Sequence, residues 1–468
     1  MRQGVFFGIA GVFGSALLWL ASFKVVALWL GPAGVGLFSQ LRQIAQAATI
    51  GATFGGTNAV VQGLSAREDE SDRRRFRATV SRLIGGTGAS IGLIILILAP
   101  ILTRFFLSSE DSNLITSVRW LGFAVMLNVG GTYTIAVLNG YRAYRHLAVA
   151  QVAGPLGLAV AMASAYFLRV DYSPAMLGWM FILCFGLTYL VGVWGIGHWT
   201  RRRTFAGVSS GRLTHQEISA FIKFALSSLI AALSATVALL LIRSWIIESR
   251  GLALAGLFDV GWTLTFNYTT LFLTACSAIY LPLLTRSTEL RSQRACMLKT
   301  AYLVLSGSIL VCYLMIFFKT PLIRLLYSKE FDAAGGLLVI LVVAVILRGV
   351  SWVYGMLIVA TQRSRTLLLS DVLFNAGLMA IVWYCLRNHN TLEALGWAFV
   401  MANFLYLVFV IEYVRRENPR MRRRDIWPFV LVASIPLVIN WGQAQWILLL
   451  MGFMISGIVW YAYKKVPA

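Results

Sequence analysis

Apolar segments long enough to cross a bilayer recur along the whole chain of 468 residues, and only short polar segments separate them. A spanning helix needs about 20 mainly apolar residues. Only 12% of the residues are charged and 59% are hydrophobic, whereas a soluble domain carries roughly 25% charged residues. These features exclude a soluble globular protein. They predict an all-α polytopic membrane protein.

Fourteen segments are predicted to span the membrane, each bounded by charged or turn residues. Their ranges are 4–30, 36–64, 79–102, 114–140, 147–168, 175–199, 218–247, 253–282, 297–318, 333–360, 366–386, 393–414, 426–440 and 445–463. The first is too long for a signal peptide and lacks a cleavage site of small residues, so we expect it to be retained. The thirteenth is short and contains Pro436, so 426–463 form either two full spans or a re-entrant hairpin.

The cationic residues predict the orientation of the chain. A net charge of +22 would indicate a nucleic-acid partner in a soluble protein, but here topology accounts for most of it. With a cytoplasmic N-terminus, the inner segments carry 26 Lys and Arg residues and the outer segments carry 7. Short cytoplasmic loops are enriched in cations in this way. We therefore expect both termini in the cytoplasm and no nucleic-acid partner.

The two halves of the sequence repeat each other. A Gly-Leu-Phe tripeptide opens a span at Gly36 and again at Gly256. A cationic turn, Arg142–Arg145, follows the first tripeptide, and its counterpart, Arg363–Arg365, follows the second at an interval that differs by only one residue. This spacing predicts a duplication into two six-helix bundles. An even number of helices in each half gives the halves a parallel orientation about an axis along the membrane normal.

Four domains follow from the spans and the repeat. They are an N-terminal six-helix bundle (1–200), a cytoplasmic linker (201–217), a C-terminal six-helix bundle (218–415) and an extra helix pair (416–468). Transporters built from such halves bind substrate between them and work by alternating access.

Four cations lie within the predicted spans, namely Lys24, Arg42, Arg243 and Arg348. A cation at the bilayer centre costs about 3 kcal/mol on insertion scales, so these residues require partners or water. The first three lie near periplasmic span ends, where snorkelling to the interface is the alternative. Arg348 lies near the middle of its span, where snorkelling is harder. Arginine pairs bidentately with phosphate and lysine supplies a point charge, so the four predict a cavity for an anionic substrate.

Other polar and aromatic residues accompany these cations. Asp259 and Asp371 are candidates to bind a coupling H⁺ or Na⁺, with a structural ion pair as the alternative for Asp259. Two larger sets suit a wet, sugar-binding cavity, or alternatively ordinary packing and interhelical hydrogen bonds. They are Asn58, Asn128, Asn139, Asn267 and Asn375, and Trp19, Trp262, Trp352, Tyr354 and Tyr268. The five cysteines show no paired spacing and enzyme motifs are lacking, so we expect neither a metal site, nor another cofactor, nor an enzyme.

The residues from Leu30 to Gln43, LGPAGVGLFSQLRQ, resemble the hairpin between the first and second spans of the Wzx-type flippases, within the multidrug/oligosaccharidyl-lipid/polysaccharide (MOP) exporter superfamily. Segments beginning at Ala278, Ile323 and Arg363 extend the resemblance in order. The resemblance implies that the four intramembrane cations bind substrate, because the family shows cations at the matching positions. It has Gln where this chain has Asp259, which puts a coupling role for that residue in doubt. Family members usually have twelve helices, so 426–463 is a departure.

The resemblance implies a flippase that moves an undecaprenyl-diphosphate-linked oligosaccharide from the cytoplasmic to the periplasmic leaflet of a bacterial inner membrane. The cargo would be a repeat unit of O-antigen, common antigen or exopolysaccharide, and the polysaccharide polymerase and chain-length machinery would be partners. Two alternatives remain open. A MATE-type ion-coupled antiporter would want an acidic cavity for cationic drugs, and a membrane polymerase or ligase would need a sizeable periplasmic loop.

Overall fold

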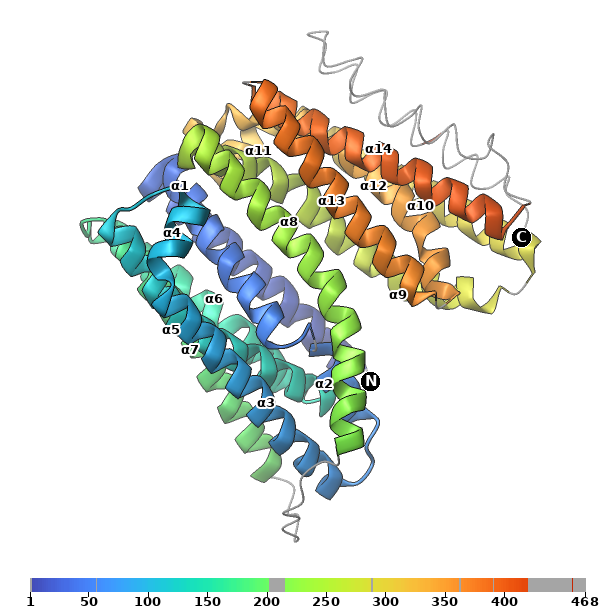
Figure 1. The fold of residues 1–468 in the computed structure, drawn as a ribbon, viewed down its shortest axis with the longest axis horizontal. Coiled ribbons are helices and arrows are strands. Elements are labelled where there is room, and N and C mark those ends of the chain that lie inside the picture. The colour runs from blue at the N-terminus through green and yellow to red at the C-terminus, as the bar shows by residue number, and fades with distance from the viewer. Residues whose placement is uncertain are drawn as a thin grey trace. The chain divides into compact units, whose positions relative to one another are not determined.

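The computed structural model describes residues 2–55, 57–201, 215–287, 289–361, 363–389 and 391–419, together with Gly457. Within these ranges every regular element is a helix (Figure 1). Ten of the helices are long and apolar enough to cross a membrane. The predicted all-α polytopic membrane fold is therefore confirmed. Apart from Gly457, the predicted spans at 426–440 and 445–463 lie outside the described residues.

The chain divides into two compact units, Met1–Ala253 and Leu254–Ala468. The predicted domain bounds of 1–200, 201–217, 218–415 and 416–468 stay a prediction. Most of the predicted linker and most of the predicted extra helix pair lie outside the described residues.

The first unit contains seven helices and most of an eighth in its described residues. They are α1 (Arg2–Ala52), α2 (Thr57–Ser65), α3 (Glu70–Ile97), α4 (Ala99–Leu107), α5 (Ser112–Gly140), α6 (Tyr144–Phe167), α7 (Pro174–Arg201) and α8 (His215–Trp262). Helix α5 packs against α3 and α7, and α1 packs against α6. Glycines allow the close approach of α3 to α5, because a Cβ at Gly92 would collide with the carbonyl of Gly122.

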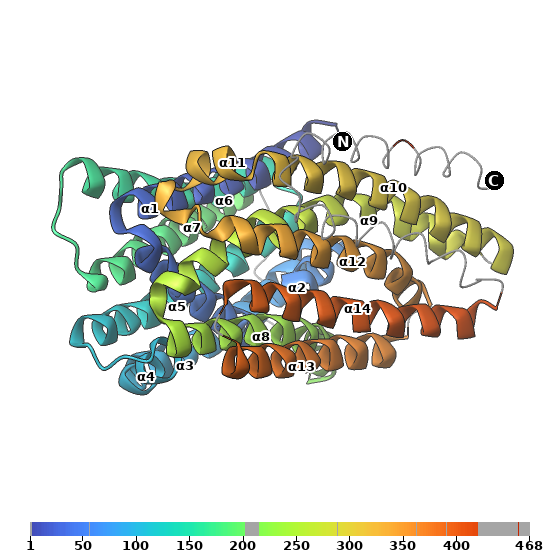
Figure 2. The same cartoon turned by 90° about the horizontal axis from the view of Figure 1, so that it is seen from above.

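The second unit continues from the end of α8. Its described elements are a π-helical turn (Thr263–Asn267), α9 (Tyr268–Arg286), α10 (Leu290–Phe317), α11 (Lys319–Leu326), a 3₁₀ turn (Lys329–Phe331), α12 (Ala334–Ala360), α13 (Ser364–Asn388) and α14 (Leu392–Glu417). Helix α12 lies between α10 and α14 (Figure 2). It is buried along almost its whole length, which explains why its sequence is apolar apart from Arg348 and Ser351.

Two of the long helices are each broken at one glycine. In α1, which is 51 residues long, Gly31 has φ 63° and ψ −162°. In α8, which is 48 residues long, Gly251 has φ 83° and ψ 172°. These backbone angles are open to glycine and strained for other residues. The break divides α1 into two spans, whereas the part of α8 after Gly251 covers only 252–262 and forms a span together with the π-helical turn and α9. Counted in this way, the described residues supply twelve membrane-crossing segments, which correspond to the first twelve predicted spans. The predicted span 36–64 differs in that it is interrupted after Ala52, and α2 follows as a separate helix.

The duplication predicted from the sequence is visible in the helix boundaries. The number of residues from Gly31 to Gly251, the two kink glycines, recurs between other pairs of positions. The same number separates the start of α3 from the start of α10, and the end of α3 from the end of α10. The same interval separates the end of α5 from the end of α12, and the start of α6 from the start of α13. Residues separated by this interval are therefore treated as equivalent positions of the two halves.

Candidate functional site

A polar cavity of about 510 Å³ lies within the first unit. Helices α1, α2, α5, α7 and α8 and the α1–α2 turn supply its walls. The lining residues are Trp19, Arg42, Gln46, Thr49, Ile50, Thr53, Gly55, Thr57, Asn58, Asn128, Thr132, Phe185 and Ala232. Ligand cavities usually measure about 300–1,000 Å³, so this one is large enough to hold a small molecule or part of a larger one.

One face of α1 provides most of the polar groups. Arg42, Gln46, Thr49 and Thr53 follow one another at intervals of four, three and four residues, which places them in one row along a helix. The Thr49 hydroxyl donates to the carbonyl of Ala45 at 2.8 Å and accepts from Asn128 Nδ2 at 2.8 Å. This second bond ties α1 to α5 and holds the Asn128 amide at the cavity wall.

Arg42 is the cation of this cavity. Its guanidinium lies 4.8 Å from the centroid of the Trp19 ring and 5.3 Å from that of Phe23. Both rings belong to the first half of α1, so the kink at Gly31 brings them back against the second half. Cation–π contacts of this kind contribute roughly 0.5–2 kcal/mol. They orient the guanidinium at the cavity wall, where its fork of N–H groups suits an anion.

The chain reverses at one edge of the cavity to leave α1. Phe54 and Gly55 have left-handed φ angles of 55° and 62°, and α2 begins at Thr57. This turn brings Thr57 and Asn58 to the cavity wall beside Thr53. Asn58 and Asn128 thus line the cavity as the sequence predicts.

Arg243 fastens α8 to α1 within the first unit. Its side chain is 6% exposed, and its Nη1 donates to the carbonyl of Ser39 at 3.3 Å. Nearby, Gln40 Nε2 donates to the hydroxyl of Ser244 at 2.9 Å. Arg243 does not line the polar cavity, and neither does Lys24, which is half-buried in the first half of α1. Their predicted roles in substrate binding stay predictions.

Arg348 belongs to the second unit, on α12. Its guanidinium lies 4.6 Å from the centroid of the Phe374 ring and 5.2 Å from that of Tyr406. Its Nη1 is buried and has no hydrogen-bond partner among the described residues. Such an unsatisfied charged donor is costly inside a membrane, so this side chain is suited to receive an anion.

The two candidate coupling carboxylates also lie in the second unit. Asp259, near the end of α8, is 2% exposed. Asp371, on α13, is half-buried and interacts electrostatically with Arg348. Whether either residue binds H⁺ or Na⁺ stays a prediction.

Five polar residues line the polar cavity without having been predicted from the sequence, namely Gln46, Thr49, Thr53, Thr57 and Thr132. A signal was present for three of them, because Gln46, Thr49 and Thr53 follow Arg42 at helical spacing inside an otherwise apolar span. Thr57 enters through the turn after α1, and Thr132 lies one helical turn from Asn128 on α5. Neither of those two placements can be inferred without the fold.

No family model matches the chain. Among curated proteins, the lipid III flippase of Escherichia coli (strain K12) is 25% identical over 389 residues, which cover 79% of this chain and 88% of that protein. The lipid III flippase of Shigella flexneri matches equally well.

Solved structures share the fold. An inward-facing MATE multidrug-resistance transporter of the MOP superfamily superimposes with a TM-score of 0.72 at 14% identity, covering 88% of this chain and 98% of that one. The lipid II flippase MurJ, in an inward closed conformation, gives a TM-score of 0.70 at 12% identity, covering 99% and 98%.

The fold is therefore that of the MOP exporters, and the chain is a multi-pass membrane protein of this architecture. Within that class its sequence is similar to lipid III flippases. The resemblance that was drawn from the residues between Leu30 and Gln43 is confirmed.

Proposed function

We propose that the protein is a flippase for an undecaprenyl-diphosphate-linked oligosaccharide. The polar cavity of the first unit carries this proposal, because a cation and several neutral hydrogen-bonding groups line a space inside a bundle of spanning helices. Arg42 suits a phosphate, and the amides and hydroxyls around it suit the hydroxyl groups of sugars. Trp19 offers an aromatic face. The similarity to lipid III flippases supports the same substrate class.

The proposed transport direction is from the cytoplasmic to the periplasmic leaflet of a bacterial inner membrane, by alternating access. The cargo is a repeat unit of O-antigen, common antigen or exopolysaccharide, which the polymerase and chain-length machinery would then use. Lys24, Arg243 and Arg348 are proposed to join Arg42 in binding the diphosphate and glycan.

Complementation tests this function. The chain is expressed in bacterial strains that lack their own flippase and whose repeat units are known, and both surface polymer and lipid-linked repeat units on the cytoplasmic face are measured. We expect polymer display in at least one strain. Arg42→Gln should abolish display and cause repeat units to accumulate. Arg104→Gln is the matched control, because the Arg104 side chain is 78% exposed on α4. Failure of the unchanged chain in every strain would contradict the proposal.

The orientation is tested separately with reporter fusions. Fusions after Arg75, Arg203 and Arg424 should report the cytoplasm, whereas fusions near Asn113 and Asn390 should report the periplasm. Opposite locations for Arg203 and Arg424 would show that the number of spans between them is odd and that the proposed topology is wrong.

A MATE-type ion-coupled antiporter is the second candidate, and two intramembrane carboxylates favour it, the buried Asp259 and the half-buried Asp371. If Asp259 or Asp371 carries the coupling ion, its Asn variant should express normally and lose gradient-dependent transport. Resistance to cationic drugs that depends on these carboxylates, without complementation of any flippase mutant, would favour this second function.

A further inference from the structure

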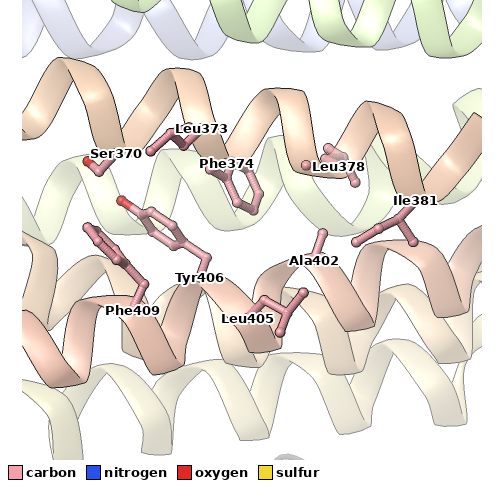
Figure 3. A pocket seen from close by; sticks show the side chains of 10 residues that line it. Ser370, Leu373, Phe374, Leu378, Ile381, Ala402, Leu405, Tyr406 and Phe409 are labelled. Atoms are coloured by element: carbon pink, nitrogen blue, oxygen red, sulfur yellow. The ribbon is translucent and has the colours of Figure 1, made fainter.

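An apolar groove runs between α13 and α14 in the second unit (Figure 3). Its lining residues are Ser370, Leu373, Phe374, Gly377, Leu378, Ile381, Ala402, Leu405, Tyr406 and Phe409. The hydroxyl groups of Ser370 and Tyr406 are the polar side-chain groups among them, and in Figure 3 both lie toward the same end. The groove is distinct from the polar cavity of the first unit.

The groove exists because the two halves differ at equivalent positions. In the first unit, Gly154 of α6 lies directly against α7, since a Cβ there would collide with Thr188 and with the carbonyl of Cys184. The residue at the equivalent position of the second unit is Phe374. Tyr406 stands at the position equivalent to Gly186 of α7, which lies beside Leu127 of α5. The rings of Phe374 and Tyr406 contact each other with centroids 4.9 Å apart. At the Phe374 position, a ring therefore separates α13 from α14, where the glycine of the first unit allows close contact.

Glycine at the next turn leaves this space empty. Gly377 has no atom within 4 Å of the position that a Cβ would take, whereas its equivalent in the first unit, Gly157, lies against Leu187. The same small residue thus closes a helix contact in one half and forms the floor of a groove in the other.

The groove opens at the surface of the second unit, between two helices that are long and apolar enough to span a membrane. Leu373 and Leu405 on its two rims are 65% and 53% exposed. Its α13 wall, from Ser370 to Ile381, spans about 16 Å at 1.5 Å per residue, which is about half the hydrocarbon thickness. It encloses about 230 Å³, less than the roughly 300 Å³ of the smallest usual ligand pockets. These dimensions suit one stretch of a hydrocarbon chain.

A half-buried cation, Arg348, packs against the inner wall. Phe374 and Tyr406, which line the groove, are the two rings against which the Arg348 guanidinium packs. The wall of this apolar groove therefore includes two rings that also contact an arginine with an unsatisfied N–H group. This combination matches an amphiphile that has a hydrocarbon tail and an anionic head.

We propose that the α13–α14 groove binds the polyprenyl tail of the lipid-linked substrate while its diphosphate is held at Arg348. The inference deepens the proposed flippase function and rests on it. A bulk phospholipid does not fit both features at once. Arg348 lies twelve residues from the end of α12 at Ala360, about 18 Å along the helix, whereas phospholipid phosphates stay at the interface. A diphosphate that is being carried across the membrane does pass this depth.

The experiment fills the groove with a larger side chain and locates the polyprenyl tail by photolabelling. The full-length protein in liposomes is photolabelled with a polyprenyl diphosphate that carries a diazirine on its tail, and the labelled peptides are identified by mass spectrometry. Gly377→Phe places a ring in the empty space. Gly86→Phe is the matched control, because Gly86 on α3 is also exposed and also has nothing within 4 Å. A phospholipid with the same diazirine reports on bulk lipid.

The unchanged protein should be labelled on the α13 and α14 residues of the groove, and unlabelled polyprenyl diphosphate should compete. Gly377→Phe should lower this labelling by at least about tenfold, equivalent to losing the burial of roughly two methylene groups. Gly86→Phe should not lower it. Four results would each overturn the inference. The first two are labelling of residues outside the groove and groove labelling that Gly377→Phe leaves unchanged. The other two are a crosslink from the groove to another part of the chain, and equal labelling by the phospholipid that unlabelled polyprenyl diphosphate does not compete away.

The complementation assay separates this result from the function itself. If the unchanged chain complements a strain but is not labelled in the groove, the flippase function stands and the tail site is wrong. If the unchanged chain complements no strain, the function fails, whatever the labelling shows.

Discussion

The two halves of this protein share one helical frame and carry different chemistry on it. In the first half, Arg42 and Gln46 begin the polar row of α1 that lines a cavity. The residues at the equivalent positions of the second half are Trp262 and Phe266, which stack on each other with centroids 4.2 Å apart at the π-helical turn. A polar face in one half has thus become an aromatic one in the other.

The cation of the second half occupies a different position. Asn128 on α5 lines the polar cavity and binds Thr49, and its equivalent on α12 is Arg348, which packs on two rings. Glycine contacts between α6 and α7 are replaced by the α13–α14 groove. With the same arrangement of helices, the first half therefore lines a cavity with hydrogen-bonding groups, and the second half places the cation Arg348 beside an apolar groove.

Among the substitutions that test this difference between the halves, those at Arg348 are expected to have the largest effect on polymer display. Arg348→Ala should abolish polymer display at normal protein levels, and Arg348→Lys should rescue it only in part, because a point charge replaces a bidentate fork. Losing a charged hydrogen bond costs about 1.5–3 kcal/mol, or roughly 10- to 150-fold in binding. Surface polymer and accumulated lipid-linked repeat units are measured together.

Arg387→Ala is the control for this prediction, because Arg387 also packs on a ring, that of Trp383 at 4.0 Å, but is exposed near the end of α13. It should leave display unchanged. The prediction is contradicted if Arg348→Gln, present at the normal protein level, displays as much polymer as the wild type and accumulates no lipid-linked repeat units. That result would show that the cation has no part in transport.

The two kink glycines test the feature that the halves share. Gly31→Ala and Gly251→Ala force a side chain into backbone angles that cost about 1–3 kcal/mol, so each should lower the thermal unfolding midpoint in detergent. Gly85→Ala, in the middle of α3 with nothing within 4 Å of the new Cβ, should be neutral or slightly stabilising. Equal midpoints for all three variants would mean that the kinks adapt to a side chain.

Much of this frame could be predicted from the sequence. Apolar length and bounding charges located the first twelve spans, except that the span predicted at 36–64 ends at Ala52. The spacing from Gly36 and Gly256 to their cationic turns indicated the duplication that the helix boundaries show. These signals are local or periodic, so they can be recognised in the sequence without knowing how the helices pack. The short helices α2, α4 and α11 were not predicted as separate elements. Helix α2 and the start of α4 fall within the predicted spans 36–64 and 79–102, and α11 follows the predicted span 297–318.

The candidate site was less predictable. Charge inside an apolar span singled out Arg42, Arg243 and Arg348, but not which of them lines a cavity. Arg243 instead binds the backbone of Ser39, a contact between residues that lie far apart in the sequence. The groove depends on Phe374 meeting Tyr406 across two helices. Such contacts are set by tertiary packing and leave no periodic trace in one sequence.

A smaller effect is expected from the hydrogen bond that links Asn128 to Thr49. Asn128→Val, Thr49→Val and the double variant form a mutant cycle in which the coupling energy should be about 0.6–2 kcal/mol, as for other interhelical bonds in membranes. Asn403→Val is a useful comparison, because the Asn403 amide donates within its own helix, to Phe399 at 2.8 Å. Additive effects of the two cavity variants would show that the bond does not join α1 to α5.

The smallest expected effect concerns the short helices that follow α3 and α10. Arg104 of α4 contacts Glu110 at a single distance of 3.6 Å. Arg324 of α11 binds Asp332 with two nitrogens, Nε at 3.0 Å and Nη2 at 2.6 Å. These hydrogen bonds from Arg324 hold the pKa of Asp332 below its ordinary value of 3.8. The second half should therefore hold its short helix more firmly than the first.

The direction of the pKa shift sets the pH dependence of this contact. Because the folded protein favours the ionised carboxylate of Asp332, the stabilisation is fully present above its ordinary pKa and is lost as the pH falls through the lowered value. Hydrogen exchange of α11, corrected for the intrinsic rate, should stay constant from about pH 8 to about pH 5 and should rise only in stronger acid. Asp332→Asn should raise exchange in α11 at neutral pH, while Glu110→Gln should leave α4 unchanged, since a single exposed contact is screened by water and salt. Equal responses of the two helices would mean that the bidentate contact gives the second half no advantage at this point.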